Sequence, residues 1–262
     1  MFMNKIADKI ADRTLVSVCM ATYNGAKYIR EQVDSILNQE FKENPNIELE
    51  LVVSDDGSTD ETIQILEAYH DPRIKIFNHQ DKKKYKYFNA NRLASDNFGN
   101  ALMNAHGDYL FFSDQDDVWM PSKLDKSLTL LREYGGGIGT AFYVGDENLR
   151  HIGEVIYNHH APFFSLKDQI GIYGFSMGFC KEELKYILPI PSFVAGHDKY
   201  IQYSLKWRNK LHFIDEPCAI HRWTGTHNVS SFTHNNSQPP FFVKCLFRLN
   251  TYLSVIWRSI VR

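Results

Sequence analysis

The sequence lacks the cysteine spacing of a zinc ribbon and the apolar core of a signal peptide. Its 262 residues include four cysteines that stand far apart, with no C-x-x-C pair: Cys19, Cys180, Cys218 and Cys245. This spacing excludes a zinc ribbon and fits buried thiols in a reducing compartment. At the N-terminus, Lys5-Ile6-Ala7-Asp8 and Lys9-Ile10-Ala11-Asp12 repeat a charged, helix-like pattern. We therefore expect a cytoplasmic protein with a helical extension at residues 1–13.

An excess of positive charge and the glycine-rich phosphate loops are also missing. The formal net charge is −2, which argues against general nucleic-acid binding because that function requires a basic surface. Neither GxGxxG nor GxxxxGK[ST] occurs, which disfavours dinucleotide enzymes and P-loop ATPases. A nucleotidyltransferase is disfavoured as well, because the turn near the N-terminus carries the single Gly25 and no charge.

What the sequence does contain is an alternation of short apolar runs and helical patterns. We expect buried strands at residues 15–20, 49–53 and 74–77. A helix at residues 28–37 separates the first two, and a helix capped by Ser58 or Thr59 separates the second and third. This alternation predicts an α/β protein with a mostly parallel sheet flanked by helices.

The next part of the chain continues the pattern. Residues 97–105 have helical spacing, and Asp108 followed by an apolar run to Phe112 predicts a further strand. Another helix is expected to begin at Pro121 and to end at the glycine run 135–137. This run is the best candidate boundary between two halves, and residues 138–235 should complete the sheet and shape a cleft.

Three unusual turns follow predicted strands, at residues 21–25, 54–60 and 113–119. In open parallel sheets, ligands collect at the carboxyl ends of the strands. The convergence of the three turns at one edge therefore predicts a binding site there.

The last of these turns concentrates negative charge, because Asp114, Asp116 and Asp117 fall within four residues. Clustered carboxylates repel one another and raise each other's pKa. A hard divalent cation with phosphate oxygens as its other ligands would relieve this repulsion. The alternative is a solvated acidic turn, which the apolar strand before it and the segment Val118-Trp119-Met120-Pro121 after it disfavour.

With these turns identified, the chain resembles glycosyltransferase family 2. The resemblance rests on VSVCMATYN at 16–24, VSDDGSTDET at 53–62 and SDQDDVW at 113–119. It implies an inverting enzyme of the Rossmann-like GT-A fold with a nucleotide-sugar donor. The D-Q-D-D-x-W form is similar to the branch that contains many bacterial rhamnosyltransferases.

The resemblance implies a catalytic domain at residues 14–235. Its halves would be a nucleotide-sugar-binding half at 14–133, where the match is clear, and an acceptor-binding half at 138–235.

The resemblance also implies how a donor would be held. Asp56 would accept a hydrogen bond from the N3–H of a pyrimidine, which rewards UDP or dTDP over a cytosine nucleotide. The remaining donor-binding residues would hold the base, the ribose and the phosphates: Ala21, Thr22, Tyr23, Asp55, Asp114 and Arg222.

For the cation, the resemblance implies that Asp116, with Asp117, holds Mg²⁺ or Mn²⁺ against the donor diphosphate, where negative charge grows as the sugar leaves. A late basic motif departs from the family pattern, because Thr224 stands where a histidine is expected. His227 is the candidate replacement as a metal ligand, and whether it or Thr224 takes that role is left open.

On the acceptor side, Gly196-His197-Asp198 resembles the family's base motif. Asp198 would be the general base that deprotonates the acceptor hydroxyl, and a helix N-cap without chemistry is the alternative. The residues implied to line the acceptor site are Trp119, Gly174, Ser176, Met177 and His197. For the segment that begins at Gly174, a tight strand corner remains the alternative.

The tail at residues 241–262 is apolar and aromatic, with four basic residues and no acidic ones. The basic residues interrupt every window long enough to span a bilayer. An amphipathic helix of this kind predicts contact with an anionic membrane surface. The alternatives are a terminal helix folded onto the core and a homodimer contact.

These features predict transfer of a sugar from dTDP-rhamnose or a UDP-hexose to a lipid-linked surface polysaccharide or lipopolysaccharide acceptor. Such an enzyme would work at the cytoplasmic membrane. The alternative function is that of a non-catalytic nucleotide-sugar- or glycan-binding relative of the same fold.

Overall fold

The computed structural model describes residues 13–79, 83–164, 171–194, 196–224 and 239–262. The predicted extension at residues 1–13 therefore lies, apart from Arg13, outside the described part of the chain.

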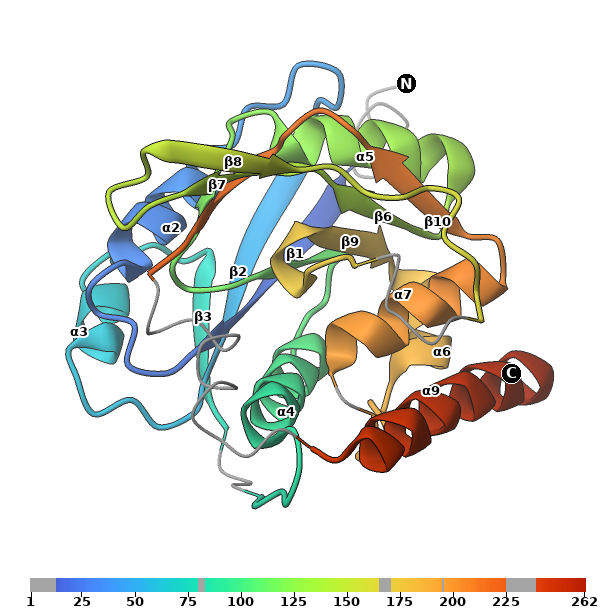
Figure 1. Ribbon diagram of the computed structural model, residues 1–262. Coiled ribbons are helices and arrows are strands. Elements are labelled where there is room, and N and C mark those ends of the chain that lie inside the picture. Colours follow the sequence, from blue (N-terminus) through green and yellow to red (C-terminus); the bar gives the residue numbers. More distant parts are fainter. Residues whose placement is uncertain (1–12, 80–82, 165–170, 195, 225–238) are drawn as a thin grey trace.

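The centre of the protein is a mixed, mostly parallel sheet with the strand order β10-β6-β9-β4-β1-β2-β3 (Figure 1). Its strands are β1 Thr14–Thr22, β2 Ile47–Asp55, β3 Ile74–Asn78, β4 Tyr109–Ser113, β6 Gly137–Thr140, β9 Met177–Cys180 and β10 Leu211–Ile214. Strand β9 is antiparallel to both β4 and β6, and the other neighbouring pairs are parallel. The α/β class and the four strands expected up to residue 113 are confirmed.

The apolar runs become strands because the middle of the sheet is covered on both faces. Val18 in β1 lies between Leu51 in β2 and Phe111 in β4, and all three side chains are buried. The sequence of a strand that is buried on both faces is a nearly continuous run of apolar residues. Strands β6, β9 and β10 come from the second half of the chain, so the two halves share this sheet.

Helices cover the sheet on both sides, with α4 and α7 opposite α5 (Figure 1). The helices are α2 Ile29–Leu37, α3 Thr62–Glu67, α4 Asn89–Met103, α5 Lys123–Tyr134, α6 Leu184–Ile187, α7 His197–Trp207 and α9 Phe241–Val261. The helix expected at 97–105 is the second half of α4. The predicted cap is wrong: α3 starts at Thr62 after Glu61, because Ser58 instead binds Asp55 through its backbone N–H, at 2.8 Å.

A second sheet, with the order β5-β11-β7-β8, brings distant parts of the chain to the end of β4. Its strands are β5 Val118–Trp119, β7 Phe142–Gly145, β8 His151–Val155 and β11 Ala219–Arg222. Strand β11 pairs with β5 through Ala219 opposite Trp119 and Ile220 opposite Val118. The segment after Asp117 is therefore fixed beside residues 219–222.

The predicted C-terminal helix is confirmed as α9, which packs against α6 and α7 (Figure 1). Tyr252 and Val255 are buried, and the ring of Tyr252 lies 5.1 Å from that of Tyr203 in α7. One face of the tail is thus folded onto the core, as one alternative expected. None of the helices in the described ranges combines the length and apolarity that a membrane span needs.

Candidate active site

The acid cluster, defined as Asp114, Asp116 and Asp117, lies between the end of β4 and the start of β5. Burial and the charges of Asp117 and Asp116 raise the pKa of Asp114 well above its ordinary value. Burial and the charge of Asp117 raise the pKa of Asp116 to about 7. The cluster therefore holds its negative charge at a cost that a bound cation would reduce.

Asp117 has a different environment from the other two, because its side chain is fully buried. One carboxylate oxygen accepts hydrogen bonds from His221 Nδ1 at 2.8 Å and from the backbone N–H of Arg222 at 3.1 Å. Burial opposes protonation of His221, yet the charge and hydrogen bond of Asp117 raise the pKa of His221 to about 9. Asp117 thus forms a buried ion pair through Oδ1, whereas its Oδ2 has no hydrogen-bond partner within the described ranges, and its part in holding a metal stays a prediction.

Trp119 is also buried, with 2% of its surface exposed, because β5 is covered by the core. Its ring lies 3.9 Å from the ammonium group of Lys123, which donates a hydrogen bond to the Phe175 carbonyl at 2.7 Å. Burial lowers the pKa of Lys123 to about 7. The acceptor contact of Trp119 stays a prediction, and in this structure its buried ring packs against the Lys123 ammonium.

Arg222, predicted to contact phosphate, is buried and occupied by protein groups. Its Nε donates to the Asp116 carbonyl at 2.9 Å, and its other nitrogens bind the Glu31 carboxylate and the Glu147 carbonyl. The guanidinium also lies 4.5 Å from the ring of Tyr28. A phosphate would have to displace one of these partners, so Arg222 first of all fixes the backbone at Asp116.

The first predicted turn is tied to the acid cluster by Gln115. The side-chain amide of Gln115 accepts a hydrogen bond from the Tyr23 N–H at 2.9 Å and donates one to the Tyr23 carbonyl at 3.1 Å. Gly25 permits this approach, because a Cβ there would lie 2.3 Å from Gln115 Oε1. Tyr23 itself remains 54% exposed, while Ala21 is partly and Thr22 fully buried.

The second turn is held by Asp55, whose side chain is buried. Asp55 accepts hydrogen bonds from the Thr22 hydroxyl at 2.9 Å and from the N–H groups of Gly57 and Ser58 at 2.9 and 2.8 Å. This network fixes the neighbouring Asp56, which lies 3.3 Å from Nδ1 of His79 just beyond β3. The structure thus brings Tyr23 and Asp56 to the same edge of the sheet.

Asp198 lies in the first turn of α7 and is partly buried. The helix is capped by Gly196 and not by Asp198, so the N-cap alternative is wrong. The charge of Asp198 is close enough to the acid cluster to contribute to the raised pKa of Asp114, after burial and the other two aspartates. Residues 84 positions apart in sequence therefore share one site.

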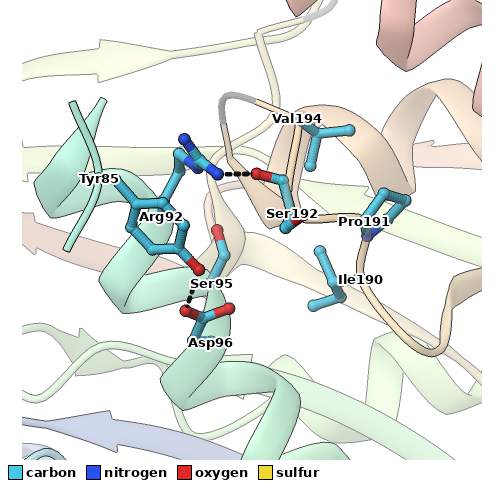
Figure 2. Close-up of a pocket in the computed structure, with 8 residues that line it drawn as sticks. All are labelled: Tyr85, Arg92, Ser95, Asp96, Ile190, Pro191, Ser192 and Val194. Carbon is cyan, nitrogen blue, oxygen red and sulfur yellow. Dashed lines mark hydrogen bonds between the residues drawn. The ribbon is translucent and has the colours of Figure 1, made fainter. Parts of the chain in front are cut away.

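The start of α7 is anchored to α4. The backbone N–H of His197 donates to the Ser95 hydroxyl at 2.8 Å, and the imidazole of His197 is buried against Phe98, with ring centroids 4.4 Å apart. Figure 2 shows the neighbouring contacts, in which Arg92 binds the Ser192 carbonyl and Tyr85 binds Asp96. The cavity between them measures about 10 Å³, room for no more than a water molecule.

The predicted acceptor segment is only partly available. Ser176 and Met177 are buried, because Ser176 bonds to the Tyr157 hydroxyl and Met177 begins β9 inside the sheet. These two residues and His197 are buried in this structure, and their role as acceptor contacts stays a prediction. Gly174 is partly exposed, and its neighbour Tyr173 is 46% exposed.

The described ranges contain no group of three His, Cys, Asp or Glu side chains arranged to hold a metal ion. The predicted ligand His227 lies outside these ranges, at a position for which no structure is described. The donor set that fits a hard cation is Asp114 and Asp116, whose raised pKa values reflect uncompensated carboxylates in a buried setting.

Sequence reasoning missed the residues that support the site: Gln115, Lys123, His221 and His79. Gln115 stands inside the quoted motif, so its position between two aspartates was an available signal. His221 precedes Arg222 in the late basic motif, which was a second signal, whereas Lys123 and His79 carry no local pattern because their partners are distant in sequence.

Comparison with known proteins gives a matching family model and several similar relatives. The family model described as "Glycosyl transferase family 2" matches residues 17–188. Glycosyltransferase EpsE of Bacillus subtilis is 34% identical over 137 residues, which are 50% of this chain and 44% of the relative. The teichuronic acid biosynthesis glycosyltransferase TuaG, also of Bacillus subtilis, is 36% identical over 46% of this chain and 43% of its own. The match thus spans less than half of each relative.

Solved structures share the fold. S. aureus TarS 1-349 in complex with UDP-GlcNAc has a TM-score of 0.62 at 21% identity, covering 83% of this chain and 61% of that chain. The mannosyltransferase PcManGT from Pyrobaculum calidifontis, in complex with GDP-Man and Mn²⁺, has a TM-score of 0.54 at 16% identity, covering 95% and 74%. At these identities the likeness establishes the architecture alone.

Proposed function

This chain belongs to glycosyltransferase family 2, and from that premise we propose that it is an inverting transferase. It moves a sugar from a nucleoside-diphosphate sugar to a saccharide acceptor. The observation that carries the proposal is the contact between the start of α7 and the end of β4: the ring of His197, the residue before Asp198, lies 5.1 Å from that of Phe112, two residues before Asp114. An inverting transfer needs a base on one side of the sugar and charge stabilisation on the other, and these residue sets supply both.

For the donor, we propose a pyrimidine nucleotide. Tyr23 offers an exposed ring for the base, and the partly exposed Asp56 offers an acceptor for the N3–H of uracil or thymine. Two donors remain under the proposal, a UDP-hexose and dTDP-rhamnose. TarS, whose structure contains UDP-GlcNAc, supports the first, and the D-Q-D-D-x-W motif supports the second.

For the cation, we propose Mg²⁺ or Mn²⁺ held by Asp116, with Asp114 beside it. When bound, the ion would stabilise the negative charge that develops on the departing diphosphate. The Mn²⁺ in the PcManGT structure and the repulsion by Asp117 and Asp116, which after burial raises the pKa of Asp114, support this assignment. The buried pair of Asp117 and His221 would keep the backbone of the cluster in place.

Asp198 is the proposed general base. It takes the proton of the acceptor hydroxyl as that oxygen bonds to the anomeric carbon and the bond from that carbon to the phosphate oxygen breaks. Its place in the first turn of α7 puts the carboxylate at the positive end of the helix dipole, which favours an anion. Only the ionised form can accept the proton.

The acceptor is proposed to be a lipid-linked saccharide of a surface polysaccharide. The names of TuaG and EpsE place relatives among glycosyltransferases, and TuaG in teichuronic acid biosynthesis. The apolar outer face of α9 supports work at a membrane surface.

The experiment is a thermal-shift measurement with UDP, dTDP, GDP and CDP, each with and without Mn²⁺. Ligand binding to the folded state raises the melting temperature in proportion to occupancy. We expect a Mn²⁺-dependent rise with UDP or dTDP alone. An equal rise with GDP would contradict the role given to Asp56.

Asp198→Asn then separates an enzyme from the alternative, a binding module without catalysis. The variant should keep the nucleotide-dependent shift and release nucleoside diphosphate from UDP-hexose or dTDP-rhamnose about 100-fold more slowly. Asp215→Asn, which changes an exposed aspartate paired with His159, is the matched control and should change neither measurement. Turnover that survives in Asp198→Asn would reject Asp198 as the base.

A further inference from the structure

Tyr173 is an open aromatic ring in a segment whose other side chains are hidden. Phe175, Ser176 and Met177 are fully buried, whereas Tyr173 is 46% exposed. An exposed aromatic ring beside a site is a useful contact for a ligand only if the ring is held in place. Whether Tyr173 can contact a ligand therefore depends on what fixes its ring and on what lies beside it.

The ring is held by aromatic neighbours. Its centroid lies 5.4 Å from that of Phe142 in an edge-to-face arrangement and 6.0 Å from that of His221. The backbone is fixed too, because the Tyr173 carbonyl accepts hydrogen bonds from the N–H of Ser176 at 3.1 Å and from its hydroxyl at 2.8 Å. The ring is thus positioned before any ligand arrives, which lowers the entropic cost of binding.

Tyr173 lies between the proposed base, Asp198, and the acid cluster. On one side, Gly174 touches the residue before Asp198, since a Cβ at position 174 would lie 2.6 Å from Nε2 of His197. On the other side, His221 joins the ring to Asp117.

Tyr157 lies next to the same segment. Its hydroxyl is 2.6 Å from that of Ser176, which in turn donates a hydrogen bond to the Tyr173 carbonyl. Tyr173 is therefore the exposed ring of a packed group that adjoins the residue before Asp198.

We propose that the exposed face of Tyr173 is a saccharide subsite that binds a pyranose ring of the acceptor. The C–H groups on one face of a pyranose carry a small positive charge and pack against the negative face of an aromatic ring. This inference rests on the proposed transfer and adds to it the residue that holds the acceptor sugar. It also adds an exposed ring to Ser176 and Met177, which the sequence had suggested for that task.

The test uses the full chain with UDP and Mn²⁺ and measures binding of octyl glycosides of glucose, galactose, N-acetylglucosamine and rhamnose by saturation-transfer NMR. We expect the wild-type chain to bind at least one of them through the pyranose ring. Tyr173→Ala should raise its Kd about tenfold, and Tyr173→Phe should keep the wild-type Kd because the ring is retained.

A tyrosine of similar exposure serves as the matched control. Tyr134→Ala removes a ring that is 52% exposed at the end of α5 and should change nothing.

Two results would overturn the subsite: glycoside binding that survives in Tyr173→Ala, or no glycoside binding by a chain that binds UDP. Failure to bind any nucleotide would instead count against the proposed function, so the two failures are distinguishable.

Discussion

Within the acid cluster, neighbouring aspartates have different environments and therefore different tasks. Asp117 is buried and paired with His221, whereas Asp114 and Asp116 keep raised pKa values without a counter-charge as close. A single-residue shift along an irregular turn decides which carboxylate points into the protein. The three residues are of the same type, so the different environments of their carboxylates depend on the partners that each one meets.

The raised pKa of Asp116 predicts a pH-dependent stability of the unliganded chain. The pKa is about 7 in the folded protein and 3.8 in the unfolded chain, so ionisation costs more free energy in the folded state. The contribution of Asp116 to the free energy of unfolding therefore falls as the pH rises from about 4 to 7, and it stays low above pH 7. Because of Asp116, the free energy of unfolding of the wild type should be lower at pH 8 than at pH 5 by on the order of 2 kcal/mol. We expect Asp116→Asn to abolish this difference. Urea denaturation at both pH values measures it.

The control for this prediction is Asp146→Asn, because Asp146 makes local hydrogen bonds in the turn between β7 and β8. That variant should keep the wild-type difference between the two pH values. An Asp116→Asn variant with the full wild-type pH dependence would contradict the assigned cost.

At the scale of elements, α9 fastens the segment that leads toward Asp198. The guanidinium of Arg258 donates hydrogen bonds to the carbonyls of Ile187 at 2.8 Å and Tyr186 at 3.3 Å, at the end of α6. Arg262 binds the Leu188 carbonyl at 3.2 Å. Since α6 and α7 both pack on α9, the helix holds the approach to the proposed base.

We predict that Arg258→Ala lowers the free energy of unfolding by about 2 kcal/mol, because charge-assisted hydrogen bonds to partly buried carbonyls are lost. Guanidinium denaturation measures the change. Ile260→Ala, which truncates a largely exposed side chain on the same helix, should cost much less. Equal effects of the two substitutions would show that α9 does not fasten this segment.

At the scale of the whole molecule, α9 leaves an apolar outer face. Its exposed large side chains are Phe241, Phe242, Leu246, Leu249, Leu253, Trp257, Ile260 and Val261. The tail carries four basic residues and no acidic ones. Arg258 and Arg262 bind core carbonyls, and two copies packed through the tail would bring the like charges of Lys244 and Arg248 together. An anionic lipid surface instead supplies the opposite charge, with about 1 kcal/mol for each basic residue near it.

We predict that the chain sediments with phosphatidylglycerol vesicles and not with phosphatidylcholine vesicles, and that salt weakens the binding. Replacing Leu253 and Trp257 together by serine should reduce the bound fraction at least fivefold, because the apolar contact supplies much of the affinity. The same double substitution should leave the melting temperature within a few degrees of wild type. A concentration-dependent dimer with no vesicle binding would favour the homodimer contact instead.

The sequence by itself determined the first four strands of the sheet, the order of the first elements and the C-terminal helix. Periodicity reports which face of an element is buried, and the runs at 15–20 and 49–53 are apolar apart from Ser17 and Glu50. The sequence also predicted that the three turns lie together, because the carboxyl ends of parallel strands meet at one edge of the sheet.

Only the tertiary structure decided which polar groups meet there. His221 lies 104 residues from Asp117, and Gln115 lies 92 residues from Tyr23, so no local pattern could pair them. Burial of Ser176 and Met177 likewise depends on β9 entering the sheet between β4 and β6. A side chain's neighbours across the fold are set by packing of distant elements, and packing is a property of the assembled chain.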